Sequence, residues 1–257
     1  MQEQDFPKGA TLVFGGSGGI GSAVAASFAR AGSDLAVVYR SKKNVAERVA
    51  EEAKQSGRKT SIHAADVTDP AQVQAAAAAA LKEHGRIHTV IWGAGPVVEQ
   101  VHLSEITPEL WKRSIDIEAN GFFNAVRATL PMLREGGGGS YVHLGSAGHV
   151  FWPPKDGLSV VPKAANEALI KGIAKEEGRN KVRANSVLVG VIEAGMFLEL
   201  LQRGVFNQAW IDEVQKMLAL KRWGKPEEIG HAAVFLASNR GAYITGQQIN
   251  VSGGFGV

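Results

Sequence analysis

The stretch Val13-Phe14-Gly15-Gly16-Ser17-Gly18-Gly19-Ile20-Gly21 decides the fold of this chain, because it joins an apolar run to an alanine-rich segment. The pattern predicts a strand, a tight glycine turn and the start of a helix. The first amides of such a helix point out of the turn and carry partial positive charge, so a dinucleotide pyrophosphate is the expected ligand. A strand-to-helix turn without a ligand is the open alternative. The residues expected to bind the pyrophosphate are Gly15, Ser17, Gly19, Ile20 and Gly21.

Seven apolar runs rich in β-branched residues alternate with helix-like segments along the chain. The runs are Ala10–Phe14, Leu35–Tyr39, Ser61–Ala65, His88–Trp92, Tyr141–Leu144, Ala184–Val189 and Gln248–Val251. The helical segments are Ser22–Ala31, Asn44–Ser56, Ala71–His84, Pro108–Leu133, Ser159–Glu177 and Pro226–Ser238. Strands that alternate with helices form βαβ units. The sequence therefore predicts an α/β fold, with a doubly wound parallel sheet of about seven strands and helices on both faces.

The composition is that of an ordinary globular protein, since 45% of the 257 residues are hydrophobic and 21% are charged. A chain of this length can bury one full core, so residues 1–257 are expected to form a single domain. The absence of cysteine excludes disulfides, thiolate metal sites and a cysteine nucleophile, and no metal site is expected. The polar start and the lack of a long apolar run predict a cytoplasmic protein that does not enter membranes. The net charge of +3 is scattered, which argues against nucleic acid as a partner but favours a phosphorylated ligand.

The residues at the end of the second predicted strand select the cofactor. In dinucleotide-binding sheets an acid at this point bonds the adenosine ribose, whereas an arginine accommodates a 2′-phosphate. Here Tyr39 takes the place of the acid, and Arg40 and Ser41 follow it. NADP(H) is therefore favoured over NAD(H). The alternative is that Arg40 is only a solvated strand end.

Two further turns follow predicted strands at the same edge of the sheet, where open α/β sheets bind ligands. Asp66 and Val67 are expected to contact the adenine, although Asp66 with Thr68-Asp69-Pro70 could equally form a turn and a helix cap. The small residues Gly93, Ala94 and Gly95 form the other turn and complete the predicted adenosine side of the site.

Several motifs, in order and spacing, make the chain similar to the short-chain dehydrogenase/reductase family. Besides the two glycine turns they are Gly145-Ser146-Ala147-Gly148, Ser159-Val160-Val161-Pro162-Lys163, Arg222-Trp223-Gly224-Lys225-Pro226-Glu227-Glu228-Ile229 and Gly253-Gly254. The resemblance extends from about Lys8 to Gly254. It implies a Rossmann-type fold and hydride transfer between a nicotinamide and a carbonyl, an alcohol or an activated double bond.

Four residues assist catalysis in that family, and two of them are retained. The resemblance places the family's serine at Ser146, where it would hydrogen-bond a substrate oxygen. It places the lysine at Lys163, which would hold the nicotinamide ribose and lower the pKa of a proton donor. The family's tyrosine falls on Ser159, whose hydroxyl is a much weaker acid with a shorter reach. We interpret Ser159 as the N-cap of the following helix, which would explain why Pro162 is tolerated.

The family's asparagine falls on Glu118, which is the second departure from the pattern. The Glu118 carbonyl could hold a water beside the lysine, its carboxylate could pair with Lys163 or titrate itself, or the side chain could face solvent. After the sixth strand, Gly190 and Ile192 are expected to contact the nicotinamide end, although the family's proline and threonine are missing there. The departures cluster in the nicotinamide half of the site, whereas the adenosine half is intact.

A proton donor other than tyrosine is therefore expected. The ionisable candidates are His149, Asp156 and Glu118, and His149 is favoured because the ordinary pKa of histidine lies near neutrality. Apolar side chains at Phe151-Trp152 and Met196-Phe197-Leu198 predict an apolar substrate, with packing in the core as the alternative.

These observations favour an NADP(H)-dependent oxidoreductase that reduces an apolar carbonyl, enone or imine-like group. One alternative is a non-redox enzyme, such as a lyase, dehydratase or cyclase, that keeps the dinucleotide as a structural part. The other is a non-catalytic NADP(H)-binding protein. The segments Pro108–Leu133 and Ser159–Glu177 resemble the helix pair that forms dimers in the family, so a homodimer or homotetramer is expected.

Overall fold

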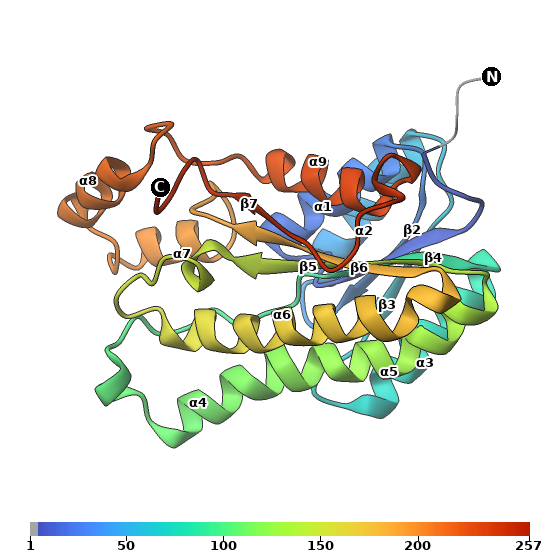
Figure 1. Cartoon of the computed structure of the whole chain (residues 1–257), viewed down its shortest axis with the longest axis horizontal. Coiled ribbons are helices and arrows are strands. Elements are labelled where there is room, and N and C mark those ends of the chain that lie inside the picture. Colours follow the sequence, from blue (N-terminus) through green and yellow to red (C-terminus); the bar gives the residue numbers. More distant parts are fainter. Residues whose placement is uncertain (1–4) are drawn as a thin grey trace.

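The computed structural model describes residues 5–257 and contains a sheet of seven parallel strands in the order β3-β2-β1-β4-β5-β6-β7 (Figure 1). The strands are β1 (Ala10–Phe14), β2 (Asp34–Tyr39), β3 (Thr60–Ala64), β4 (Ile87–Trp92), β5 (Gly139–Ser146), β6 (Val182–Val189) and β7 (Gln248–Val251). The chain winds outward from β1 to β3 and then crosses to β4, so the topological switch point lies between β1 and β4. The predicted doubly wound sheet is confirmed, and every strand end lies within two residues of its expected place.

Helices cover both faces of the sheet (Figure 1). One face carries α1 (Gly19–Arg30), α2 (Lys43–Gln55) and α9 (Pro226–Ala237), and the other carries α3 (Pro70–His84), α5 (Gly121–Glu135) and α6 (Gly157–Glu177). Because side chains alternate along a strand, each central strand contributes side chains to the hydrophobic cores on both faces of the sheet. In β1, Val13 packs with α1 and α9, whereas Leu12 and Phe14 pack toward α3 and α5.

The segment predicted as one α-helix over 108–133 is divided. It consists of α4 (Pro108–Ile115), a π-helical turn η2 (Asp116–Asn120) and α5. The prediction of an uninterrupted α-helix is wrong at η2, where five residues form a π turn, a rare i→i+5 arrangement that was not anticipated from the apolar pattern. The π turn carries Glu118, whose carbonyl accepts a hydrogen bond from Asn166 Nδ2 of α6 at 3.2 Å.

Helix α6 begins at Gly157, two residues before the predicted start, with Asp156 at the N-cap. The interpretation of Ser159 as the N-cap is therefore wrong. Ser159 lies in the first turn, where it is 6% exposed, and its amide donates to the Asp156 carbonyl at 3.0 Å.

Pro162 consequently lies inside α6, where its missing N–H leaves the Leu158 carbonyl without its helical donor. Ser114 Oγ of α4 donates a hydrogen bond to that carbonyl. The proline is tolerated because a side chain from the neighbouring helix replaces the missing backbone donor, and not because it lies next to a cap.

Two short helices, α7 (Met196–Gln202) and α8 (Gln208–Met217), follow β6 beyond the carboxyl end of the sheet (Figure 1). They were not predicted. Aromatic side chains of α7, α8 and the segment between them pack on one another, with Phe206 of that segment and Trp210 of α8 stacked at a centroid distance of 3.8 Å. Within residues 5–257 no helix combines the length and apolar character needed to cross a membrane.

Candidate active site

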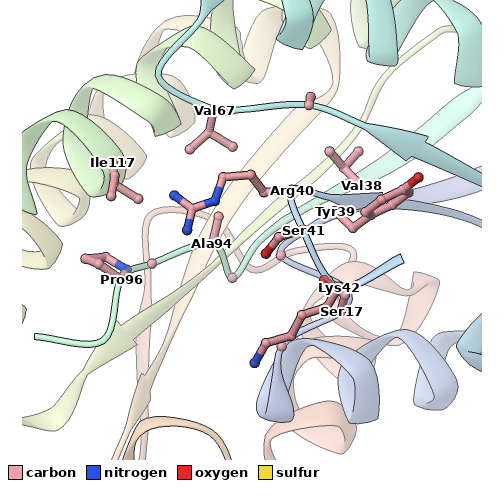
Figure 2. A pocket seen from close by; sticks show the side chains of 15 residues that line it. Ser17, Val38, Tyr39, Arg40, Ser41, Lys42, Val67, Ala94, Pro96 and Ile117 are labelled. Atoms are coloured by element: carbon pink, nitrogen blue, oxygen red, sulfur yellow. The ribbon is translucent and has the colours of Figure 1, made fainter. Parts of the chain in front are cut away.

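A pocket opens at the carboxyl ends of β1 and β4, at the switch point of the sheet (Figure 2). We call it the β1/β4 pocket. It is lined by Gly15, Ser17, Gly18, Val38, Tyr39, Arg40, Ser41, Lys42, Ala65, Val67, Gly93, Ala94, Gly95, Pro96 and Ile117. The structure therefore brings together residues from all three turns that the sequence assigned to the cofactor, together with the end of β2.

The two glycine turns lie against each other at the floor of this pocket. Gly15 has φ +79°, a conformation that favours glycine, and a side chain there would collide with the backbone of Gly93 and Ala94. Helix α1 has Gly18 at its N-cap, no capping side chain and no acid in its first turn. Its first amides therefore have no side-chain acceptor within this turn, which fits the pyrophosphate of a dinucleotide.

Two cations at the end of β2 line the same pocket. Figure 2 shows the Arg40 guanidinium extending between Val67 and Ala94, whereas the Tyr39 ring turns away from it. Within residues 5–257 neither Arg40 nor Lys42 forms an ion pair, although the adjacent Lys43 pairs with Glu47 at 3.4 Å. Arg40 and Lys42 are therefore available to an anionic group of a ligand.

Several residues predicted to bind the cofactor lie outside the lining of the pocket. Gly21 supports the turn, because a side chain there would collide with the Gly15 carbonyl, and Gly19 lies against Gly195. Gly190 packs on Ser252. Two more predicted residues outside the lining are Ile20, which is half-buried in α1, and Ile192, which is 2% exposed beneath Gly224. Asp66 and Lys163 also lie outside it.

Asp66 also lies outside the lining and forms the alternative turn considered from the sequence. Its Oδ1 accepts hydrogen bonds from the Thr68 amide at 2.9 Å and from the Thr68 hydroxyl at 2.7 Å. These bonds, the backbone one first, hold the pKa of Asp66 below its ordinary value. Asp69 caps α3, accepting from the Ala71 amide at 2.8 Å. Val67, in contrast, does line the pocket.

Lys163 of α6 and Glu118 of η2 form an ion pair beside the pocket. The Lys163 ammonium donates a hydrogen bond to Glu118 Oε1, and the Glu118 side chain is only 2% exposed. Gly95 of the pocket wall lies against the same carboxylate oxygen, since a side chain at Gly95 would collide with it. Of the roles left open for Glu118, the solvent-facing one is wrong, and pairing of the carboxylate with Lys163 is observed.

Ser146 ends β5 and faces the first turns of α6. Its Oγ accepts a hydrogen bond from the Gly148 amide at 3.1 Å. A side chain added at Gly148 would contact both Ser146 Oγ and Val160 of α6, so both groups lie close to Gly148. The hydroxyl of Ser146 is thereby held near the amino end of the helix that carries Lys163.

Asp156 occupies the N-cap of α6, yet its side chain forms no capping hydrogen bond. Its Oδ1 accepts a hydrogen bond from Gln100 Nε2 at 3.2 Å, from the segment that follows β4. Burial raises the pKa of Asp156 to about 6, while the Gln100 hydrogen bond and the charge of Lys163 oppose the shift. Asp156 is thus a carboxyl group that titrates close to neutral pH near Lys163.

The other expected site residues are more exposed. His149 lies at the end of a short 3-10 turn, Ala147–His149, and is exposed. Phe151, Trp152 and Leu198 are 44%, 45% and 41% exposed, which leaves them accessible to an apolar ligand. Phe197 packs among aromatic side chains, 5.2 Å from Trp223 between ring centroids, so the core-packing alternative holds for this residue.

Three residues of the site were missed in the sequence. Lys42 could have been found, because it continues the polar run Arg40-Ser41 at the end of a strand. Gln100 and Asn166 carried no signal, since they reach Asp156 and the Glu118 carbonyl only through contacts between segments distant in the chain. Within residues 5–257 no group of three or more histidine or acidic side chains could hold a metal ion.

Residues 15–256 match a family model described as "Enoyl-(Acyl carrier protein) reductase". A short-chain dehydrogenase/reductase of Pestalotiopsis microspora is 34% identical over 95% of this chain and 93% of its own length. A 3-oxoacyl-[acyl-carrier-protein] reductase of Aggregatibacter actinomycetemcomitans is 30% identical over 95% and 97%. A short-chain type dehydrogenase/reductase from Mycobacterium ulcerans has a similar structure, with a TM-score of 0.90, 28% identity and coverage of 97% and 90%. With the order of its strands and the glycine turn at its switch point, this chain belongs to the short-chain dehydrogenase/reductase family.

Proposed function

We propose that this protein is an NADP(H)-dependent oxidoreductase that reduces an apolar carbonyl, enone or imine-like group. The observation that carries the proposal is the continuity of the β1/β4 pocket. Its outer end holds the unpaired cations Arg40 and Lys42, and its inner wall at Gly95 lies against the Glu118–Lys163 pair. A dinucleotide that followed this path would reach from a phosphate-binding end to an ionisable end.

The residues of the pocket have the character that the cofactor needs. Arg40 and Lys42 would bind the 2′-phosphate, because neither forms an ion pair within residues 5–257 and an arginine at this position of the fold suits that group. The first amides of α1 would bind the pyrophosphate. Gly93 and Ala94 would allow close approach of the adenosine side. When bound, the reduced nicotinamide would supply a hydride to the acceptor carbon.

The residues at the inner end act on the substrate and the ribose in this proposal. Ser146 would donate a hydrogen bond to the acceptor atom and so orient it. Lys163 would hold the nicotinamide ribose, in exchange for or in addition to its bond to Glu118. Ser159, four residues before Lys163, is too weak an acid to replace a phenol, so a different group completes the reaction.

An apolar substrate is supported by Phe151, Trp152 and Leu198, which stay partly exposed although they are large and apolar. The description of the matching family model names an enoyl reductase, and one relative is named as a 3-oxoacyl reductase. These names support both a polarised C=C bond and a carbonyl as the reducible group.

The test is consumption of NADPH, followed by its absorbance, with three matched groups of apolar compounds: ketones, α,β-unsaturated ketones and cyclic imines. We expect turnover of at least one group, and a loss of about 10²–10³-fold in kcat for Ser146→Ala, since one oriented donor to the acceptor atom is removed. Ser252→Ala, which changes a serine packed behind Gly190, serves as the control. Product formation without NADPH consumption would indicate the non-redox alternative, and cofactor binding without any turnover would indicate the non-catalytic one.

We also propose that residues 1–257 act as one cytoplasmic domain that assembles into a homodimer or homotetramer. Trp111 of α4 and Phe123 of α5 support assembly, because these large apolar side chains are 40% and 51% exposed in the single chain. Light scattering of the purified protein measures the assembly directly, and a monomer would contradict it.

A further inference from the structure

We propose that Asp156 is the proton donor of the reaction, in the place that Ser159 cannot fill. This inference rests on the proposed function. It adds to that function the identity of the group that delivers the proton to the substrate.

The position of Asp156 on α6 is the first support. Asp156, Ser159 and Lys163 are separated by three and four residues, so they lie along one face of the helix. Side chains on a helix lean toward its amino end, so a long side chain at position 159 would extend over the turn in which Asp156 lies. Position 156 therefore lies in the turn over which a phenol at position 159 would extend, and the charge of Lys163 acts on the Asp156 carboxyl group.

The orientation of the Asp156 side chain is the second support. An aspartate at an N-cap ordinarily accepts hydrogen bonds from the first amides of its helix, and this one does not. Its Oδ1 instead accepts a hydrogen bond at 3.2 Å from Nε2 of Gln100, a residue outside α6. Within residues 5–257 the other carboxyl oxygen, Oδ2, has no hydrogen-bond partner, and it is not fully buried. One oxygen is thus fixed, and the other is open to a ligand.

The surroundings of Asp156 raise the pKa of its carboxyl group, so a larger fraction stays protonated between pH 6 and 7 than for an ordinary aspartate. Burial is the largest influence and disfavours the carboxylate. The neutral Gln100 and the charged Lys163 act in the other direction, and Lys163 is itself compensated by Glu118 of η2. His149, the donor favoured from the sequence, is exposed and lacks this environment.

The step balances as follows. The acceptor carbon would receive a hydride from bound NADPH, the reductant, which would be oxidised to NADP⁺. The O–H bond of the Asp156 carboxyl group breaks, and its proton passes to the acceptor oxygen or nitrogen, or to the neighbouring carbon of an enone. Asp156 is left as a carboxylate, which takes a proton from water before the next turnover.

A first experiment needs no substrate. The protein is labelled with ¹³C at the aspartate carboxyl carbons, and the Asp156 resonance is identified by its absence in Asp156→Asn. We expect its titration midpoint to lie at about 6. In Gln100→Leu the midpoint should rise, because the hydrogen bond that favours the carboxylate is lost. A midpoint near 4 in the wild type would overturn the proposal, because little acid would then be present at neutral pH.

A second experiment uses the substrate found in the NADPH assay. We expect kcat/KM of the wild type to fall as the pH rises above the midpoint measured by NMR for the free protein, and this fall to shift to higher pH in Gln100→Leu by the same amount as the NMR midpoint. Asp156→Asn should lower kcat by about 10²–10⁴-fold while its NADPH dissociation constant stays within about twofold of the wild type. His149→Gln, the matched comparison, should retain the wild-type kcat and pH profile.

The two proposals fail in different ways. A wild-type protein that consumes no NADPH with any compound refutes the oxidoreductase and the donor role together. A wild type that turns over while Asp156→Asn keeps its kcat and its pH profile refutes Asp156 alone, and leaves the oxidoreductase standing.

Discussion

The Lys163 ammonium donates a hydrogen bond to the Glu118 carboxylate, which is 2% exposed and lies 45 residues earlier in the chain. The pair joins α6 to the π turn and lies directly behind Gly95 of the β1/β4 pocket. A buried carboxylate with a cation beside it is costly to break, because removal of one partner leaves the other without compensation.

Substitution of Lys163 by methionine should therefore destabilise the fold more than substitution of Glu118 by glutamine. Lys163→Met leaves a buried carboxylate unpaired and should cost about 3–5 kcal/mol of unfolding free energy. Glu118→Gln leaves a lysine that is 20% exposed and can reach water, so its cost should be about 1–3 kcal/mol. Urea unfolding of both variants and of the double variant measures this. If the two single costs simply add in the double variant, the residues do not interact.

The hydrogen bond from Ser114 to the Leu158 carbonyl should matter only because residue 162 is a proline. Ser114→Ala leaves that buried carbonyl unpaired and should cost about 1–3 kcal/mol. Pro162→Ala restores an N–H donor within α6, so in that background the cost of Ser114→Ala should largely disappear. Chemical denaturation of the four proteins completes the cycle, and an equal cost of Ser114→Ala in both backgrounds would show that the serine has another role.

The raised pKa of Asp156 predicts a defined pH dependence of stability. The unfolded chain has an aspartate pKa of about 3.9, and the folded protein has a value of about 6, so between these values the folded state binds more protons. The stabilising contribution of the neutral form is fully present below about pH 4. It is lost as the pH rises through about 6.

Asp156→Asn mimics the neutral acid at every pH. Its stability relative to the wild type should therefore increase by about 2–3 kcal/mol between pH 4 and pH 8, since a shift of two pKa units corresponds to roughly that energy. Asp212→Asn, at an exposed position of α8, is the control and should show no such change. A constant difference between wild type and Asp156→Asn across this range would contradict the shift.

Much of the fold and of the lining of the β1/β4 pocket could be predicted, because both depend on local patterns. Apolar runs located the strands, and the carboxyl edge of a parallel sheet brings Gly15, Arg40 and Gly93 together whatever the loops between them. The start of α6 could not be located in this way. The helix begins at Gly157 and continues through Pro162, and the hydrogen bond from Ser114 that makes up for the missing proline donor comes from a segment distant in the chain.

The contacts around Lys163 and Asp156 were harder to predict, because they join segments that are distant in the chain. Glu118 could be given several roles from the sequence, and only the contact between η2 and α6 selects the one with Lys163. The hydrogen bond between the Asp156 carboxyl group and Gln100 is likewise a contact between distant segments. Serine is a common N-cap residue, so position 159 was predicted to be the cap in place of Asp156.

The central claim is tested most directly by titrating the protein with NADPH and with NADH, following the fluorescence of its five tryptophans. The wild type should bind NADPH at least about 10-fold more tightly than NADH, since charge-assisted hydrogen bonds to the 2′-phosphate contribute about 1.5–3 kcal/mol. Arg40→Ala should remove most of this preference and leave NADH binding unchanged, whereas Lys43→Ala, at the neighbouring lysine that pairs with Glu47, should alter neither. Equal affinity for the two cofactors, or no binding of either, would contradict an NADP(H)-dependent oxidoreductase.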